Sequence, residues 1–232
     1  MSIPIYTKIH DALIDEVEKG IWKVGGKLPG ERELSERFGV SRLTLRQAVG
    51  ALCDEGILER RVGSGTFVVG KRVREQMRGT TSFTEIVTSQ GKEPLSRVIS
   101  YVQTQANALE AEKLGVHVGT SIVRMERIRY ADGVPICFEV ACIPASLIAG
   151  FPKQAVQEHF FATLREAGQV IGRSEQTISA KVATAELAGY LEVKTGSAVL
   201  SLSQLSFLSD ETAFEYVLSS YVGERFEFYL ER

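Results

Sequence analysis

The chain has 232 residues, of which 44% are hydrophobic and 24% are charged, and its formal net charge at pH 7 is -2. This composition is typical of a globular protein, and no stretch approaches the roughly 18 unbroken apolar residues that a membrane-spanning helix needs. The N-terminal segment lacks the basic start and apolar core of a secretory signal peptide. We therefore expect a cytoplasmic protein with no membrane partner, built from one large domain or two ordinary ones.

The first helix is expected between Pro4 and Lys19, because apolar residues recur every four positions, at Ile5, Ile9, Leu13 and Val17. The segment KVGGKLPG, residues 23–30, is typical of a turn. A two-turn helix is expected over residues 31–39, with acidic residues in its first turn and a glycine at its end.

A third helix is expected to begin after Ser41, which is placed to cap it, and to end at Gly56. Its apolar residues have the i, i+3, i+4, i+7 spacing of one core-facing stripe: Leu45, Ala48, Val49 and Leu52. The next segment, ILERRVGSGTFVV, predicts a β-hairpin with Gly63-Ser64-Gly65 as its tight turn.

Charged residues are distributed unevenly between the two parts of the chain. Residues 1–72 carry a net charge of +2 and the remainder a net charge of -4. This asymmetry is modest for a protein that binds nucleic acid, so the arrangement of the basic residues has to decide.

The third helix and the hairpin together indicate a DNA-binding element. Arg42 and Arg46 lie four positions apart on one helical face, Thr44 lies nearby, and the apolar stripe points away from them. Such a helix can lie in the major groove, where arginine binds guanine and threonine reaches a phosphate or a thymine methyl group. The hairpin glycines allow close approach to a phosphate. The alternative is that the two arginines merely form the solvated face of an amphipathic helix.

The segment KLPGERELSERFGVSRLTLRQAVGALCDEGILERRVGSGTFV resembles the winged helix-turn-helix of the GntR regulators, and the resemblance spans about residues 4–69. It implies that four residues contact double-stranded DNA: Arg32, Arg42, Arg46 and Gly63. Two positions depart from the family pattern. Gly30 replaces a serine, which weakens the cap of the second helix, and Ser64 replaces a commonly basic residue at the tip of the wing.

The segment GKRVREQMRGTT, residues 70–81, is basic and has no clear apolar period, so we predict a linker over residues 70–80. Beyond it, residues 114–139 resemble residues 191–215 in a weak internal repeat. Each copy runs from a helix end through a glycine, a strand and a polar turn to a strand that ends in Phe-Glu. The repeat predicts a pseudo-symmetric α+β domain in which Glu139 and Glu215 are equivalent.

Two arginines share an otherwise apolar strand face in the second part of the chain. In the strand expected over residues 121–130, every second side chain lies on one face, and that face carries Val123, Met125, Arg127 and Arg129. Buried arginines need an anion or carboxylates beside them. Glu139 is expected to share a face with two small residues that leave room for a ligand. The alternative is an internal salt-bridge network of the two arginines with Glu139 or Glu215.

Residues 82–228 resemble, in three separated segments, the effector domain of the HutC-type branch of that family, which has the chorismate-lyase-like (UTRA) fold. These segments are SFTEIVTSQGKEP, RIRYADGVPICFEVACIP and TAFEYVLSSYVGERFEF. The resemblance implies an effector site whose anion-binding part contains Ser82, Thr84, Arg127 and Arg129, with Phe83 beside them. It further implies that Glu139, Glu215 and Tyr221 meet the polar groups of the ligand.

One departure concerns the identity of the ligand. In the amino-sugar-phosphate repressors of this branch, a Ser and a Tyr on a helix complete the phosphate site, and their counterparts here are His159 and Phe161. The ligand is therefore either a phosphosugar held differently or another anion such as a carboxylate.

Catalysis, metal binding and disulfides find no support in the sequence. Cys53, Cys137 and Cys142 fit neither a disulfide framework nor a zinc site, and the histidines are scattered. No set of residues for nucleophilic catalysis is visible. We expect free thiols, no metal, no cofactor and no catalytic residue.

The sequence as a whole predicts an α+β protein with an N-terminal winged helix-turn-helix over residues 1–69 and a mixed α/β domain of the UTRA fold over residues 81–232. The expected function is transcriptional repression at a palindromic operator, by a homodimer that a small anionic metabolite controls. Two alternatives remain. One is an enzyme of chorismate-lyase-like fold, and the other is a DNA-binding protein whose second domain only dimerises.

Overall fold

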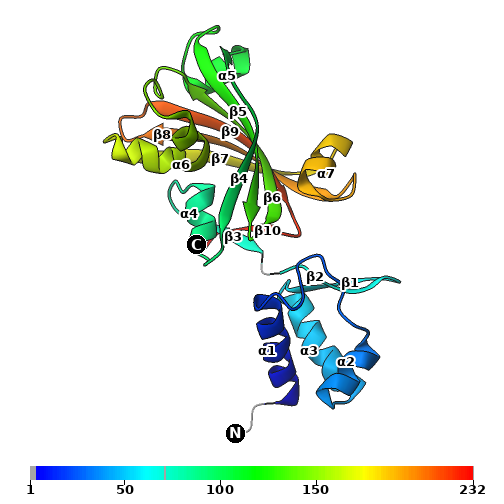
Figure 1. Ribbon diagram of the computed structural model, residues 1–232. Coiled ribbons are helices and arrows are strands. Elements are labelled where there is room, and N and C mark those ends of the chain that lie inside the picture. The colour runs from blue at the N-terminus through cyan, green and yellow to red at the C-terminus, as the bar shows by residue number, and fades with distance from the viewer. Residues whose placement is uncertain (1–3, 71, 232) are drawn as a thin grey trace. The chain divides into compact units, whose positions relative to one another are not determined.

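The computed structural model describes residues 4–70 and 72–231, and the chain divides into two compact units, residues 1–72 and 73–232 (Figure 1). Each unit has its own hydrophobic core. Among the described residues, no helix combines the length and the apolar character that crossing a membrane requires.

The N-terminal unit is a three-helix element followed by a hairpin, as the sequence predicts. Its elements are α1 (Ile5–Glu18), α2 (Glu31–Phe38), α3 (Arg42–Asp54), β1 (Leu58–Arg61) and β2 (Gly65–Val68). The two strands pair in antiparallel register, with Arg61 opposite Gly65. Gly63 lies in the turn between them with φ of +73°, a conformation that glycine adopts without strain.

The core of this unit forms around the predicted stripe of α3. Its four members are buried against Leu13 of α1 and Leu34 of α2. Each buried Leu or Val contributes about 1.5–3 kcal/mol. Ser41 caps α3, because its Oγ accepts a hydrogen bond from the Thr44 backbone N–H at 3.1 Å. The apolar stripe thus fixes the rotation of α3 and leaves its opposite face free.

The C-terminal unit is built on a six-stranded antiparallel sheet in the order β4-β5-β6-β9-β8-β7. Its elements are β3 (Val73–Gln76), α4 (Phe83–Thr88), β4 (Pro94–Gln105), α5 (Ala108–Leu114), β5 (Ser121–Ala131), β6 (Val134–Pro144), α6 (Lys153–Glu166), β7 (Ile171–Val182), α7 (Ala185–Leu191), β8 (Ala198–Leu208), β9 (Ala213–Val222) and β10 (Phe226–Tyr229). The first half, α4-β4-α5-β5-β6, and the second half, α6-β7-α7-β8-β9, follow the same order and meet at β6 and β9. This arrangement agrees with the internal repeat.

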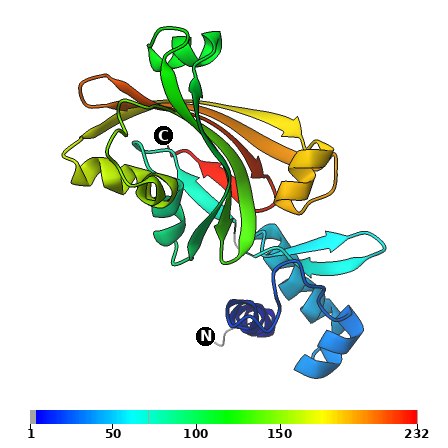
Figure 2. The same cartoon turned by 45° about the horizontal axis from the view of Figure 1, so that its top comes forward.

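The helices of the C-terminal unit cover both faces of the sheet. Helices α4 and α6 pack on the face that carries Val123 and Tyr221, whereas α5 and α7 pack on the opposite face. Helices α4 and α6 lie side by side in both ribbon views, and Arg165 of α6 forms an ion pair with Glu85 of α4 (Figure 2). The space between these two helices and the sheet holds the pocket described below.

The predicted linker over residues 70–80 is wrong in part, because residues 73–76 form β3. This strand pairs in parallel with β10, and Val73 is buried beside Phe226 in the core. The side chains of this segment alternate between buried and exposed: Val73 and Glu75 point inward, whereas Arg74 and Gln76 point outward. The alternation is short and lies among basic residues, so the sequence did not reveal a strand. The partner strand lies about 150 residues away in sequence, so no local pattern could reveal the pairing.

Candidate functional site

The N-terminal end of α3 presents three of the five residues expected to contact DNA. The side chains of Arg42 and Arg46 are exposed, and Thr44 is half-buried with its hydroxyl 2.9 Å from the Ser41 hydroxyl. Leu43 is exposed beside them. The geometry matches a helix whose first two turns enter a groove of DNA.

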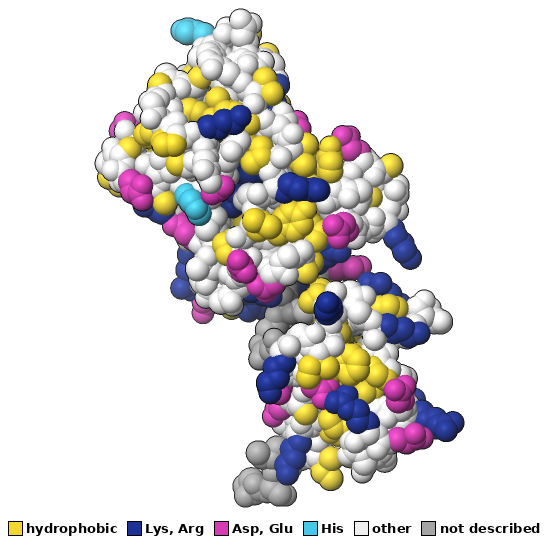
Figure 3. All heavy atoms as spheres, in the orientation of Figure 1, with side chains coloured by type: hydrophobic (Ala, Val, Ile, Leu, Met, Phe, Trp, Pro, Cys, Tyr) yellow, Lys and Arg dark blue, Asp and Glu magenta, His cyan; other side chains and the backbone are white. Residues whose placement is uncertain are grey.

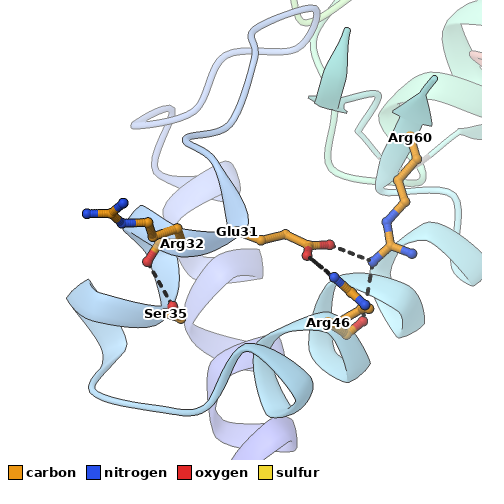
Figure 4. A network of polar contacts seen from close by, with 5 residues as sticks. All are labelled: Glu31, Arg32, Ser35, Arg46 and Arg60. Carbon is orange, nitrogen blue, oxygen red and sulfur yellow. Dashed lines mark hydrogen bonds and ion pairs between the residues drawn. The ribbon is translucent and has the colours of Figure 1, made fainter. Parts of the chain in front are cut away.

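A carboxylate that the sequence did not single out holds Arg46 in place. Glu31, at the start of α2, accepts hydrogen bonds through Oε2 from Arg46 Nε at 3.2 Å and Nη2 at 2.8 Å (Figure 4). Its Oε1 forms a longer contact of 3.4 Å with Nη2 of Arg60 in β1. Arg46 lowers the pKa of Glu31, which therefore stays ionised. One carboxylate thus orients an arginine of α3 and one of the hairpin.

The other expected DNA contacts lie on α2 and in the hairpin turn. Arg32 Nε donates to Glu36 at 3.0 Å, and the Arg32 carbonyl accepts from the Ser35 hydroxyl at 2.7 Å (Figure 4). Gly30 precedes α2 without a side-chain cap, as its lack of a side chain predicts. On the face shown in Figure 3, the N-terminal unit carries both basic and acidic side chains. The surface expected to bind DNA is therefore defined by the positions of its basic side chains more than by the total charge of the unit.

The C-terminal unit contains a pocket between the sheet and the helices α4 and α6. The empty space inside it amounts to about 750 Å³, including its open mouth. All nine residues expected to meet an effector line this pocket: Ser82, Phe83, Thr84, Arg127, Arg129, Glu139, His159, Glu215 and Tyr221. The fold thus brings together residues from α4, β5, β6, α6 and β9.

Arg129 presents unused hydrogen-bond donors at this pocket. Its side chain is buried, with 3% of the residue exposed, and Nη2 donates to the Thr84 hydroxyl at 3.1 Å. Nε and Nη1 are buried and have no partner among the described residues. The guanidinium lies over the ring of Phe83, 4.7 Å from its centroid. Burial lowers the pKa of Arg129 to about 10, so the side chain remains a cation at neutral pH. A buried cation with two free donors is a binding group for an anion.

Arg127 differs from Arg129, because its donors are already used. Its Nε and Nη2 contact Glu139 Oε1 at 2.6 and 2.5 Å, and Nη1 donates to the Gln157 carbonyl of α6 at 2.7 Å. Both partners of the ion pair are buried. The internal salt bridge considered from the sequence therefore describes Arg127, and it does not describe Arg129.

Ser82 and the residues of α6 lie at the pocket in ways that the sequence did not show. The Ser82 hydroxyl caps α4, since it accepts from the Glu85 N–H at 3.2 Å and donates to Glu85 Oε2 at 3.0 Å. His159 interrupts the helical geometry of α6 with φ of -136°, and its side chain is 63% exposed. Phe161 is buried and packs edge-on against Phe214, 5.4 Å between centroids.

Besides Glu139, two further buried carboxyl groups line the same pocket, those of Glu215 and Glu75. Burial, together with the neighbouring Glu139 carboxylate, raises the pKa of Glu215 to about 8. Burial raises the pKa of Glu75, on β3, to about 7. Tyr221 is stacked on Phe226 at 4.0 Å between ring centroids. Glu75 was missed in the sequence because the segment that contains it resembles a basic linker.

The raised pKa of Glu215 predicts that stability falls with rising pH. The folded state holds this proton from the unfolded-state pKa near 4.5 up to about 8, so the free energy of unfolding decreases across that window. Glu215→Gln is expected to raise the free energy of unfolding by about 2–4 kcal/mol at pH 8 and to change it little at pH 4.5. Urea unfolding of wild type, Glu215→Gln and the exposed control Glu175→Gln checks this. An equal effect of Glu215→Gln at both pH values would contradict it.

The described residues offer few candidate groups for disulfide formation or metal binding. The three cysteines are free, and the described residues contain no group of three or more His, Cys, Asp or Glu side chains that could hold a metal ion. The arrangement of the pocket instead suits reversible binding of a small molecule that carries an anionic group.

Comparison with known proteins identifies a known domain in each of the two units. The sequence matches the bacterial regulatory proteins of the gntR family over residues 5–68 and the UTRA domain over residues 89–227. It is 35% identical to the HTH-type transcriptional repressor NagR of Bacillus subtilis, over 99% of this chain and 96% of that one.

Two further relatives match over nearly the whole chain. One is the Mannosyl-D-glycerate transport/metabolism system repressor MngR of Escherichia coli, 29% identical over 98% of this chain and 95% of that one. The other is the crystal structure of PhnF from Mycobacterium smegmatis, with a TM-score of 0.76, 29% identity and 99% coverage of each chain. The chain belongs to the GntR family of bacterial transcription regulators, with a winged helix-turn-helix that binds DNA and a C-terminal UTRA domain.

Proposed function

We propose that this protein is a transcriptional repressor whose binding to a palindromic operator is controlled by a small anionic metabolite in the UTRA pocket. The observation that carries the proposal is the buried guanidinium of Arg129, with two donors that no described residue satisfies. The names of the relatives support repression, since NagR and MngR are both named repressors. A DNA-binding regulator of this kind works in the bacterial cytoplasm, beside the chromosome.

The anion that fits best is the phosphate of a sugar phosphate. Arg129, a cation with unused donors among the described residues, lines the pocket together with the hydroxyl of Thr84, and this pair suits a compact anionic group. Its remaining polar lining includes carboxyl groups that accept hydrogen bonds from sugar hydroxyls. The name of MngR associates that relative with a sugar derivative. Phe161 and the exposed His159 distinguish this site from the pattern of the amino-sugar-phosphate repressors.

We propose that the repressor acts as a homodimer and that its operator is palindromic. Two winged helices related by a two-fold axis contact half-sites that lie about one helical turn apart, ~34 Å. In each half-site, base edges would be contacted by three residues of α3: Arg42, Thr44 and Arg46. Arg32 would contact the DNA backbone, and Gly63 would contact DNA from the wing. An enzyme of the same fold is a weaker candidate, because no catalytic set is apparent among the pocket residues.

Replacing Arg42 or Arg46 with Ala is expected to reduce operator affinity by about 1–3 kcal/mol each, because each arginine is proposed to bind a base. Affinity for random DNA is expected to fall less, since only one charge is lost. Fluorescence anisotropy with an operator selected in vitro gives both affinities, and Arg173→Ala, on β7, is the control of equal charge. Operator affinity at the wild-type level in both variants would show that α3 is not part of the DNA-binding interface.

A further inference from the structure

Strand β3 places a buried carboxyl group in the effector pocket. Glu75 is 4% exposed and lines the pocket together with Arg129 and Glu215. It follows Arg72, the last residue of the N-terminal unit, by three positions.

The contacts of Glu75 leave most of its hydrogen-bonding capacity unused. Its Oε1 accepts one hydrogen bond, from Gln176 Nε2 at 3.2 Å. The same nitrogen donates to Gln204 Oε1 at 2.7 Å, and Gln204 Nε2 donates to the Ser206 hydroxyl at 2.9 Å. A carboxylate has about four acceptor sites, and the described residues supply this one hydrogen bond to it. This carboxyl group therefore has acceptor capacity left for a donor that a ligand carries.

Glu75 and Arg129 line the same pocket, and both act on the nearby Cys137 thiol, which is not among the residues that line it. Burial raises the pKa of the Cys137 thiol, and among the nearby charges the Arg129 cation opposes this change whereas Glu75 adds to it. Cys137 and Tyr221 lie on the neighbouring strands β6 and β9 and belong to one buried cluster with Val73 of β3. Because both side chains line this one pocket, the unused donors of Arg129 and the unused acceptors of Glu75 are open to the same ligand.

We propose that Glu75 is a ligand-binding residue that accepts a hydrogen bond from a hydroxyl or ammonium group of the same effector whose anionic group binds Arg129. This inference rests on the proposed function and narrows the ligand class. The effector is a small anion that also carries hydrogen-bond donors, as a sugar phosphate does. A dicarboxylate is disfavoured, because Arg129 offers unused donors to one anionic group, whereas the donors of Arg127 are already taken by Glu139 and the Gln157 carbonyl.

The test compares two probes that share the phosphate and differ in hydrogen-bond donors. Inorganic phosphate reports on the anion-binding part of the site, Arg129 with Thr84, whereas glucosamine 6-phosphate adds hydroxyl groups and an ammonium group. Isothermal titration calorimetry on the full chain gives both affinities for wild type, Glu75→Gln and Glu175→Gln. The control makes the same substitution at an exposed position on β7, where Glu175 contacts Arg173. Because Gln has the shape of Glu and carries no charge, Glu75→Gln is expected to fold, which its melting temperature checks.

Glu75→Gln is expected to weaken the binding of glucosamine 6-phosphate at least tenfold and to change the affinity for inorganic phosphate less than twofold. Glu175→Gln is expected to change neither. Equal affinity of wild type and Glu75→Gln for glucosamine 6-phosphate would overturn this inference and leave the proposed function standing. An equal loss for both probes would also overturn it, since the residue would then act on the fold of the pocket. If the wild type binds neither probe, the proposed anion site fails and this inference fails with it.

Discussion

Replacing Arg129 with Met is expected to abolish the response to the effector without lowering the stability of the protein. The guanidinium is buried, and two of its nitrogen atoms have no partner among the described residues. Removing one partner of a buried, charged hydrogen bond costs about 2–5 kcal/mol, which weakens binding roughly 30-fold or more. Calorimetry with glucosamine 6-phosphate and inorganic phosphate measures this loss.

Stability distinguishes this role of Arg129 from a structural one. A buried, incompletely paired cation destabilises the unliganded fold, so a Met of similar length is expected to leave the melting temperature unchanged or to raise it. The Thr84 hydroxyl loses one hydrogen bond of 3.1 Å in the variant, which is a small loss at a half-buried group. A marked fall in melting temperature together with wild-type ligand affinity would show that Arg129 serves the fold.

Arg127→Met is expected to have the opposite effect, a loss of about 3–5 kcal/mol in the free energy of unfolding. The substitution leaves the buried Glu139 carboxylate without its ion pair and the Gln157 carbonyl without its donor. The double variant Arg127→Met/Glu139→Met removes the uncompensated charge and is expected to recover at least half of the loss. Urea unfolding of the two single variants and the double variant gives the interaction free energy.

The outcome of this cycle decides between the two roles considered for Arg127. Strong coupling between Arg127 and Glu139 would confirm that the ion pair stabilises the fold. Additive losses would mean that the two side chains contribute independently to stability, which the contacts at 2.6 and 2.5 Å do not predict.

The N-terminal unit could be predicted almost completely, because its signals are local. Ser41 caps α3, Gly39 ends α2 in the left-handed conformation, and the stripe from Leu45 to Leu52 is buried. Each of these features depends on residues within one or two helical turns. Glu31 was missed because its partners, Arg46 and Arg60, are brought to it only by the fold.

The C-terminal unit shows where local patterns end. Alternation along β5 predicts correctly that Arg127 and Arg129 share a buried face. The alternation does not reveal which of the two arginines is paired, because the partners of Arg127 lie elsewhere in the sequence. Glu139 lies opposite Arg127 on the neighbouring strand β6, and Gln157 lies on α6. Strand β3, and Glu75 with it, depends on pairing with β10 at the other end of the chain. The Ser82 cap depends on Glu85, three residues later, and was visible in principle.

Control of DNA binding by the pocket is the central claim, and linkage between the two ligands tests it directly. The operator affinity of the wild type is measured by anisotropy without ligand and with saturating glucosamine 6-phosphate, glucose 6-phosphate or inorganic phosphate. We predict that a sugar phosphate weakens operator binding by a factor between about 5 and 150, and that operator DNA weakens sugar-phosphate binding by the same factor. Arg129→Met should retain operator binding and lose this coupling. Operator affinity that none of the three ligands changes, although calorimetry shows the pocket filled, would contradict the account.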